Sequence, residues 1–204
     1  MTDQTMEVIS FLLDNEALRF GDFTLKSGDR SPFFVNLGAI RRAESLATLS
    51  HFLARRVHSA FPETTLLFGP AYKGIAMATA TALAHRQAYG SNLAVCFDRK
   101  EAKEHGEQGG FIGQLPQADD RVVIVDDVIS DGGTKRQAMA TLKSEFGIET
   151  AGIVVVVNRV RRRDKASLSS LPLEALVTLP DLVDFLKHNN DPRAKSLLNF
   201  HEEE

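Results

Sequence analysis

Two spacings of apolar residues divide this chain into helices and strands. Apolar residues three or four positions apart predict amphipathic helices, whereas short apolar or alternating runs predict strands. Helices are expected at residues 6–18, 43–57 and 75–85, in the segment after Thr134, and at 180–187. Strands are expected at residues 22–26, 33–37, 65–68, 93–97, 122–125, 151–157 and 173–179.

The order of these elements predicts an α/β fold. Strands alternate with helices from residue 43 to 157, which favours a central parallel sheet flanked by helices on both faces. The two N-terminal strands are joined by a short turn and predict a β-hairpin. We expect a single domain over residues 1–204, with its core at about 41–159. The hairpin, within about 1–40, and the C-terminal strand, within about 160–190, are expected to form a small hood over the carboxyl ends of the core strands.

The composition of the 204 residues excludes several classes of protein. The net charge of −3 argues against general binding to nucleic acid or to anionic lipid, so we expect no nucleic-acid and no membrane partner. No apolar run approaches the length of about 18 residues that a membrane span needs. The N-terminus lacks the basic start and apolar core of a signal peptide. A single cysteine, Cys96, excludes an internal disulfide. We therefore expect a cytoplasmic protein.

The segment after the strand at 151–157 is strongly basic. Residues 161–165 hold four cations, a run that can indicate RNA binding. Because no aromatic residues interleave with it and the chain is acidic overall, a solvated loop is the better interpretation. Arg159 is different, since it comes at the end of a strand, where open α/β sheets bind their ligands.

The stretch Arg121–Thr134 holds the strongest chemical signal. Four β-branched residues, 122–125, predict a buried strand, and Asp126 and Asp127 follow it. Ser130-Asp131-Gly132-Gly133-Thr134 then precedes a helix, whose free N–H groups and positive dipole end favour a phosphate at this turn. Carboxylates repel a phosphate, so the acidic pair suits ribose hydroxyls or a sugar carbon that gains positive charge. The alternative is a buried strand followed by an acidic helix cap.

Two familiar phosphate-binding patterns are absent from the sequence. No Gly-x-x-x-x-Gly-Lys-Ser/Thr occurs, which excludes a Walker loop. No Gly-x-Gly-x-x-Gly follows a strand, which excludes the usual dinucleotide site. The remaining hypothesis is a site for a sugar that carries a terminal phosphate.

A second turn between a strand and a helix is Gly69-Pro-Ala-Tyr-Lys-Gly74. Glycine at both of its ends predicts a close approach of the backbone to a ligand. Lys73 places a cation at a helix N-terminus, where the helix dipole disfavours it, and this favours an anionic ligand beside it.

Two further segments have both a structural and a functional interpretation. Residues 98–110 predict a long surface loop, either simply solvated or a mobile cationic lid over a diphosphate. The cations of this loop are Arg99, Lys100, Lys103 and His105. Phe33 and Phe34 lie in the hairpin near Lys26, and they either pack as a small lid or stack on a flat anionic ring.

The stretch Val122–Thr134 resembles the phosphoribosyl-diphosphate signature of the type I phosphoribosyltransferases. That signature has apolar residues, two acids, two apolar residues, a hydroxyl residue, any residue and Gly-Gly-Ser/Thr, and every position here fits it. The resemblance implies that residues 130–134 hold the 5′-phosphate of 5-phosphoribosyl 1-diphosphate. It also implies that Asp126 and Asp127 contact the ribose hydroxyls.

Further segments resemble the members of this family that use orotate, and with Arg159 the resemblance covers residues 20–159. They are residues 20–36, 69–74 and 99–107. Some family members have a cis peptide in the second segment, where Ala71–Tyr72 is the candidate. The chain departs from the pattern at Val35, where many bacterial members have a second phenylalanine, and at Gln108, an additional residue in the loop.

The resemblance implies transfer of the phosphoribosyl group to orotate, giving orotidine 5′-phosphate and diphosphate, a step of pyrimidine (UMP) biosynthesis. The implied catalytic residues are Asp126, Asp127, Lys103 and Lys73. The implied contacts to 5-phosphoribosyl 1-diphosphate are Lys26, Tyr72, Lys73, Arg99, Lys100, Lys103, His105, Asp126, Asp127, Val128, Ile129, Ser130, Asp131, Gly132, Gly133 and Thr134. The implied contacts to orotate are Lys26, Phe34, Val35, Ser130 and Arg159.

The resemblance also implies Mg²⁺ and a homodimer. Mg²⁺ would be held mainly by substrate oxygens and water, with no fixed protein ligand. Part of the loop 98–110 would cross to the active site of the partner subunit. Two alternatives remain: an enzyme of the same fold that uses a purine or another base, which would lack the Lys26 hairpin, and a non-catalytic regulator that senses the phosphoribosyl compound, which would carry a DNA-binding segment.

Overall fold

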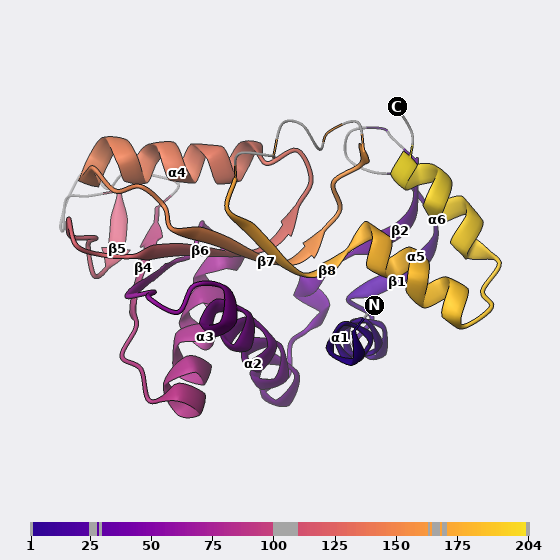
Figure 1. The fold of residues 1–204 in the computed structure, drawn as a ribbon, viewed down its shortest axis with the longest axis horizontal. Coiled ribbons are helices and arrows are strands. Elements are labelled where there is room, and N and C mark those ends of the chain that lie inside the picture. Colours follow the sequence, from indigo (N-terminus) through magenta and orange to yellow (C-terminus); the bar gives the residue numbers. More distant parts are fainter. Residues whose placement is uncertain are drawn as a thin grey trace.

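The centre of the molecule is a six-stranded sheet, seen in a computed structural model that describes residues 2–24, 28, 30–99, 110–162, 164, 168 and 171–202. The strand order is β5-β4-β3-β6-β7-β8 (Figure 1). Neighbouring strands are parallel, except that β5 runs antiparallel to β4. The strands are β3 (Leu66–Phe68), β4 (Ala94–Asp98), β5 (Phe111–Gly113), β6 (Val122–Ile129), β7 (Gly152–Asn158) and β8 (Leu173–Thr178). The predicted α/β fold with a central, mostly parallel sheet is confirmed.

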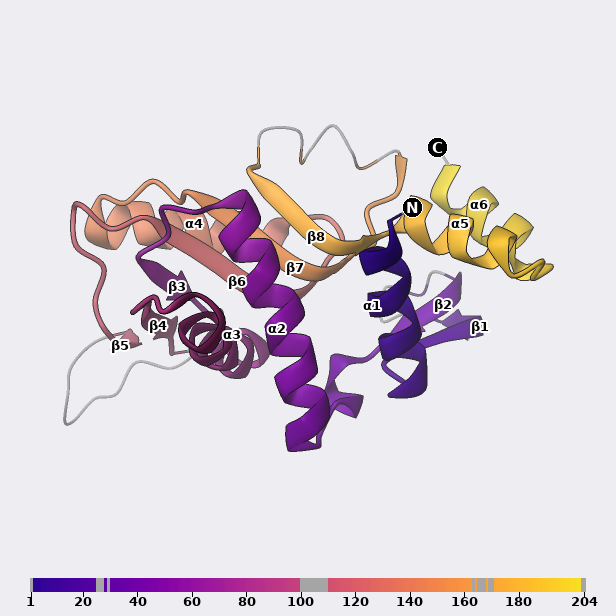
Figure 2. The same ribbon diagram turned by 60° about the horizontal axis from the view of Figure 1, so that its bottom comes forward.

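Helices cover both faces of this sheet. α2 (Ala43–Ala60) and α3 (Lys73–Tyr89) lie on one face, and α4 (Gly133–Phe146) lies on the other (Figure 1). Figure 2 shows α1 (Asp3–Asp14) beside α2. The predicted helices at 43–57, at 75–85 and after Thr134 are therefore confirmed. Among the residues that the structure describes, no helix is both long and apolar enough to cross a membrane.

β6 is buried because its side chains alternate between the two covered faces. Val123 and Val125 lie in the apolar cluster that includes residues of α2 and α3. Val122 and Ile124 lie in the other cluster, together with Ala138 of α4. A strand that is buried on both faces has a continuous apolar sequence, which explains the β-branched run of this segment.

The first helix is shorter than the apolar spacing predicted. α1 ends at Asp14 rather than at residue 18. Glu16 has a φ of 55°, a left-handed conformation that a helix cannot continue. The buried residues Ala17 and Leu18 then lead directly into a strand, which also contains Gly21.

The predicted hairpin is present with earlier bounds, and it packs against the C-terminal helix. β1 (Leu18–Thr24) pairs antiparallel with β2 (Arg30–Val35), and a short 3₁₀ helix, η1 (Leu37–Ala39), follows. The fully buried ring of Phe33 meets Phe200 of α6 (Arg193–Glu202) edge-on, with 5.8 Å between the ring centroids. The apolar spacing did not predict α6, because only two of its residues are buried.

The C-terminal strand belongs to the main sheet, which corrects its expected place in the hood. β8 pairs in parallel with β7, and Thr178 lies opposite Asn158. Leu176 and Val177 are both buried, since the two faces of β8 are both covered. Helices α5 (Leu179–His188) and α6, rather than a strand, lead the chain from the sheet to the hairpin (Figure 1).

Candidate functional site

The predicted site residues gather at one edge of the sheet, because the carboxyl ends of parallel strands meet there. β3 ends at Phe68, opposite Ile124 of β6. β6 continues to Ile129 beside β7 alone. Beyond Ile124, the turn that follows β3 lies beside β6 in place of a strand. The two backbones are close there, since a Cβ built at Gly74 would lie 3.0 Å from the carbonyl oxygen of Val125.

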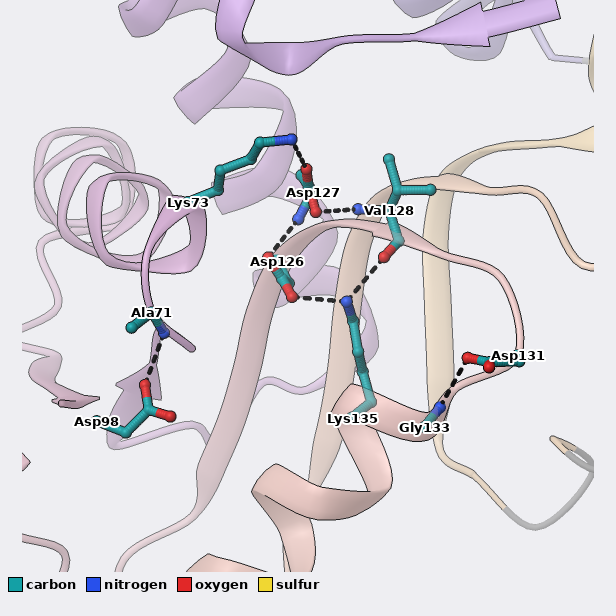
Figure 3. A network of polar contacts seen from close by, with 9 residues as sticks. All are labelled: Ala71, Lys73, Asp98, Asp126, Asp127, Val128, Asp131, Gly133 and Lys135. Atoms are coloured by element: carbon teal, nitrogen blue, oxygen red, sulfur yellow. Dashed lines mark hydrogen bonds and ion pairs between the residues drawn. The ribbon is translucent and has the colours of Figure 1, made fainter. Parts of the chain in front are cut away.

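Asp126 and Asp127 lie within β6 rather than after it, so they face opposite sides of the sheet. Oδ2 of Asp126 accepts a hydrogen bond from Nζ of Lys135 at 2.6 Å, on the α4 side (Figure 3). Oδ2 of Asp127 accepts one from Nζ of Lys73 at 2.5 Å, on the α3 side. The Oδ1 atom of each carboxylate accepts the backbone N–H of the next residue at 2.8 Å. Each acid therefore has one cation and one backbone donor as partners.

The two ion pairs differ strongly in burial. The side chains of Lys135 and Asp126 are 6% and 9% exposed, whereas those of Lys73 and Asp127 are 54% and 15% exposed. Burial raises the pKa of Asp126, and the positive charge of Lys135 opposes that rise. Lys73 thus has a protein partner, although the sequence analysis had explained this cation by a ligand alone.

Lys135 is a site residue that the sequence analysis missed. It occupies the same helical face as Ala138 and Leu142, three and seven positions later, and all three are buried. The sequence does contain a signal for this residue. A lysine on the apolar face of a helix, directly after an acidic pair and a glycine turn, indicates a buried cation near the acids. The sequence does not reveal its partner, because nine residues and a change of element separate Lys135 from Asp126.

The turn at residues 130–134 joins β6 to the N-terminus of α4. Gly132 has a φ of 75°, a left-handed conformation that favours glycine over residues with a side chain. The carboxylate of Asp131 accepts the N–H of Gly133 at 3.0 Å (Figure 3). Both hydroxyl residues of the turn are exposed, and the free N–H groups of α4 begin here. This geometry suits an anion.

The turn after β3 folds tightly on itself. A Cβ at Gly69 would lie 2.3 Å from the carbonyl oxygen of Gly74, so internal packing requires the glycine that the sequence analysis assigned to a ligand. The Ala71–Tyr72 peptide bond is cis, as the resemblance suggested. The N–H of Ala71 donates to Oδ1 of Asp98 at 2.6 Å, which ties the turn to the end of β4 (Figure 3). Tyr72 is 68% exposed.

Arg99 follows β4 at the same edge. Its Nε and Nη1 atoms are buried and have no hydrogen-bond partner in the part of the chain that the structure describes. Two unsatisfied donors on a buried cation favour an anionic partner. The other predicted cations, Lys26, Lys100, Lys103 and His105, lie outside the described residues.

Arg159 lies at the end of β7, beside the end of β6. Its backbone N–H donates to the carbonyl oxygen of Ile129 at 2.9 Å, and its guanidinium lies 5.3 Å from the ring centroid of Phe33. Within the described ranges, no carboxylate forms an ion pair with Arg159. Burial and the neighbouring Arg161 lower the pKa of Arg159. A bound anion would offset the cost of burying this charge.

Phe33 and Phe34, the two aromatic residues considered for stacking on a ring, lie next to each other in β2. Their side chains therefore lie on opposite faces of the strand. Phe34 stacks on Phe23 with 5.4 Å between the ring centroids, and the guanidinium of Arg19 lies 5.7 Å from the ring of Phe34. The ring next to the arginine at the end of β7 is therefore that of Phe33, not that of Phe34. Val35 packs, partly buried, against the same core cluster as Phe33.

Comparison with known proteins gives consistent matches over most of the chain. The family model for the phosphoribosyl transferase domain matches residues 37–170. An orotate phosphoribosyltransferase of Pseudomonas fluorescens is 40% identical over 201 residues, which cover 94% of this chain and 92% of that protein. The orotate phosphoribosyltransferase of Agathobacter rectalis is 36% identical over 197 residues, covering 91% of this chain and 87% of that protein.

A solved structure agrees with these matches. The crystal structure of orotate phosphoribosyltransferase from Francisella tularensis superposes with a TM-score of 0.81 at 29% sequence identity. The superposition covers 97% of this chain and 100% of that chain. The similarity therefore includes the hairpin and the C-terminal helices, which lie beyond the residues that the family model matches.

The unequal burial of the two ion pairs predicts unequal losses of stability. Asp126→Asn leaves the buried charge of Lys135 without its carboxylate, and we expect the free energy of unfolding to fall by about 3 kcal/mol. Asp127→Asn is the matched control, because the exposed Lys73 returns to water, and a loss below about 1 kcal/mol is expected. Urea unfolding followed by circular dichroism measures both. Equal losses would contradict the difference assigned to the two pairs.

Proposed function

Because this chain belongs to the phosphoribosyltransferase family, among its orotate phosphoribosyltransferases, we propose that the carboxyl edge of its sheet is the site where orotate meets 5-phosphoribosyl 1-diphosphate. The reaction is a pentosyl transfer of pyrimidine biosynthesis and gives orotidine 5′-phosphate and diphosphate. One observation carries the assignment of the site: the acidic pair of β6 lies between the N-termini of α4 and α3. A ribose with a phosphate at one end and a diphosphate at the other fits this order of groups.

The 5′-phosphate binds at the turn of residues 130–134. The first N–H groups of α4 have no partner within the helix, and the helix dipole is positive at this end. The exposed hydroxyls of Ser130 and Thr134 add two donors, and the N–H groups of Asp131 and Gly132 complete the cradle. Val128 and Ile129 supply the backbone that leads into the turn. The arrangement holds a phosphate without a charged side chain, which leaves the lysines for other parts of the substrate.

The ribose lies over the end of β6, next to Asp127 and Asp126. When diphosphate leaves, C1′ of the ribose gains positive charge, and nearby carboxylates lower the energy of that state. Lys73 is exposed, so the ribose hydroxyls can replace it as the partner of Asp127. No covalent bond between enzyme and sugar is needed, because positioning and electrostatics supply the rate enhancement.

The departing diphosphate is neutralised by cations at the α3 end of the site. Lys73 moves from Asp127 to the diphosphate, and Tyr72 lines the same turn. The Nε and Nη1 atoms of Arg99 are buried and have no hydrogen-bond partner among the described residues, which supports a contact with an anion at this edge. The resemblance adds Lys100, Lys103 and His105 from the loop that follows.

The residues at this edge fit a magnesium ion that arrives with the substrate. Among the described residues, no three His, Cys, Asp or Glu side chains gather closely enough to hold a metal ion. Mg²⁺ commonly keeps water and substrate phosphates as ligands, with one or two carboxylates nearby. As the resemblance implies, substrate oxygens and water would therefore hold most of the coordination shell of the ion. The ion would supply charge neutralisation of the diphosphate oxygens.

Orotate binds between the hairpin and the end of β7. Its carboxylate pairs with Arg159, which has no carboxylate partner of its own in the described chain and whose charge is half-buried. The contact between Phe33 and Arg159 supports a place for β2 beside the base site, and the resemblance adds Phe34 and Val35 of this strand. Ser130 completes the base site, and the resemblance adds Lys26.

The whole chain acts as one domain over residues 1–204, and the active unit is a homodimer with shared sites. The contact of Phe33 with Phe200 supports a joint cover of the site by the N-terminal hairpin and the C-terminal helices. The resemblance assigns part of the loop after Asp98, with Lys103 and His105, to the partner subunit's site.

Loss of orotate absorbance in the presence of 5-phosphoribosyl 1-diphosphate and Mg²⁺ tests the reaction. The wild-type chain is expected to consume orotate. Asp127→Asn should reduce kcat at least about a hundredfold, because it removes one electrostatic contributor to the transition state. Circular dichroism shows whether this variant is folded. An inactive wild-type chain, or a folded variant with normal turnover, would overturn the assignment.

Replacement of Arg159 separates the two substrates. Arg159→Ala should raise the KM for orotate at least about tenfold, since a charged hydrogen bond contributes about 1.5–3 kcal/mol. The KM for 5-phosphoribosyl 1-diphosphate should change by less than about threefold. Arg162→Ala, at an exposed arginine of the same loop, is the control and should change neither value. Equal effects of Arg159→Ala on both substrates would move Arg159 out of the base site.

Mixed dimers test the shared site. Lys103→Ala chains and Asp127→Asn chains are each expected to be nearly inactive. In a mixed dimer, one site carries both defects and the other carries neither, because two-fold symmetry makes the exchange of loops reciprocal. Random reassortment puts about half of the dimers in the mixed form, so about a quarter of wild-type activity should return. No recovery after joint refolding, when wild-type chains recover under the same treatment, would place the loop over its own subunit.

A further inference from the structure

We propose that Lys135 is a positioning residue for this reaction, which fixes Asp126 and the end of β6 and thereby makes the two carboxylates of the acidic pair unequal. The proposal rests on the proposed function, since it assigns a division of labour within the same site. The catalytic contact is left to Asp127, and Lys135 acts through Asp126.

Lys135 joins both ends of the phosphate-binding turn. Its Nζ donates to Oδ2 of Asp126 at 2.6 Å and to the carbonyl oxygen of Val128 at 2.7 Å (Figure 3). Asp126 and Val128 belong to β6, before the turn, whereas Lys135 belongs to the first turn of α4, after it. A single ammonium group therefore fixes the backbone on both sides of Asp127 and closes the loop that surrounds the phosphate position.

The burial of the two lysines decides which carboxylate can change its partner. The Lys73 side chain is 54% exposed, so it can leave Asp127 and remain solvated. The Lys135 side chain is 6% exposed, and its departure would leave a buried charge on each side. The Oδ1 atom of Asp126 is also occupied, since it accepts the N–H of Asp127 at 2.8 Å. Asp127 is thus the exchangeable carboxylate, and Asp126 is permanently paired.

The charge of Lys135 has a second consequence. Burial favours the protonated form of Asp126, and Lys135 is the cation that opposes this effect. A protonated Asp126 would no longer form the ion pair that holds α4 to β6. Without Lys135, Asp126 would take up a proton at a higher pH. The contact of its Oδ1 atom with the N–H of Asp127, which positions the catalytic carboxylate, would then weaken as the pH falls.

A merely structural ion pair would behave differently. If Lys135 only tied α4 to β6, its loss would lower stability and reduce activity by the same factor at every pH. If it positions an ionised Asp126, its loss must also move the acidic limb of the pH profile. The position of that limb is therefore the measurement that separates the two roles.

The test compares Lys135→Met with Lys143→Met as the matched control. Lys143 lies on the same helix, but its side chain is 66% exposed and its ion pair with Glu149 lies at the surface. For Lys135→Met we expect kcat/KM for 5-phosphoribosyl 1-diphosphate to fall at least about tenfold at pH 8, and the acidic limb to move up by about one pH unit. Lys143→Met should retain the wild-type profile. An unshifted limb in a folded Lys135→Met protein would overturn the proposal.

A second variant keeps the test open if Lys135→Met does not fold. Lys135→Gln keeps an amide donor without the charge, so it should show the same shift of the acidic limb, and an unshifted limb would again overturn the proposal. Calorimetric binding of 5-phosphoribosyl 1-diphosphate at pH 6 and pH 8 separates this result from the proposed function. Failure of the wild-type chain to bind overturns the function, whereas wild-type binding with a pH dependence unchanged in Lys135→Gln overturns only the role of Lys135.

Discussion

The position of two adjacent carboxylates in the central strand, Asp126 buried and Asp127 partly buried, is the constraint on which this structure rests. β6 is covered on both faces, and an ionised acid in such a place is strongly unfavourable unless a cation and hydrogen bonds compensate it. Because a strand alternates its side chains, Asp126 and Asp127 need separate partners on separate faces. α4 supplies Lys135 and α3 supplies Lys73, so each covering helix is tied to the sheet at the same point (Figure 3).

The unequal lengths of the strands make room for this arrangement. β3 stops opposite Ile124, and the turn that follows it fits against the rest of β6 because Gly69 and Gly74 approach each other so closely. Asp98 fixes the same turn to the end of β4. The helix N-terminus that carries Lys73 is therefore placed by the backbone of two neighbouring strands, and a ligand between α3 and α4 meets a largely preformed edge.

The outer layer positions the residues that the proposed function assigns to the base. Phe33 connects the hairpin both to Phe200 of the C-terminal helix and to Arg159 at the end of β7. The hairpin, the last helix and the carboxyl edge of the sheet are thus packed around one aromatic ring, although they come from opposite ends of the chain. The proposed orotate site depends on this long-range packing, whereas the proposed phosphate site at residues 130–134 depends mainly on local sequence.

Local patterns in the sequence were sufficient for the core elements and for the glycine turn before α4. The run 122–125, the helical spacing at 43–57 and the series from Ser130 to Thr134 each encode an element through neighbours in the chain, where propensity and periodicity act. The end of α1 at Asp14 was not predicted, because a single left-handed residue, Glu16, decides it. The mostly polar α6 was missed, because only two of its side chains are buried.

Only the tertiary structure decided which groups meet. The place of β8 beside β7, the pairing of Lys73 with Asp127 across 54 positions, and the burial of Lys135 against Asp126 follow from the packing of helices on two faces of a sheet. The same lysine is a surface cation or the partner of a buried carboxylate, according to what covers it. Periodicity along the chain gives the face of an element, but the free energy of a buried charge is set by the element that packs against that face.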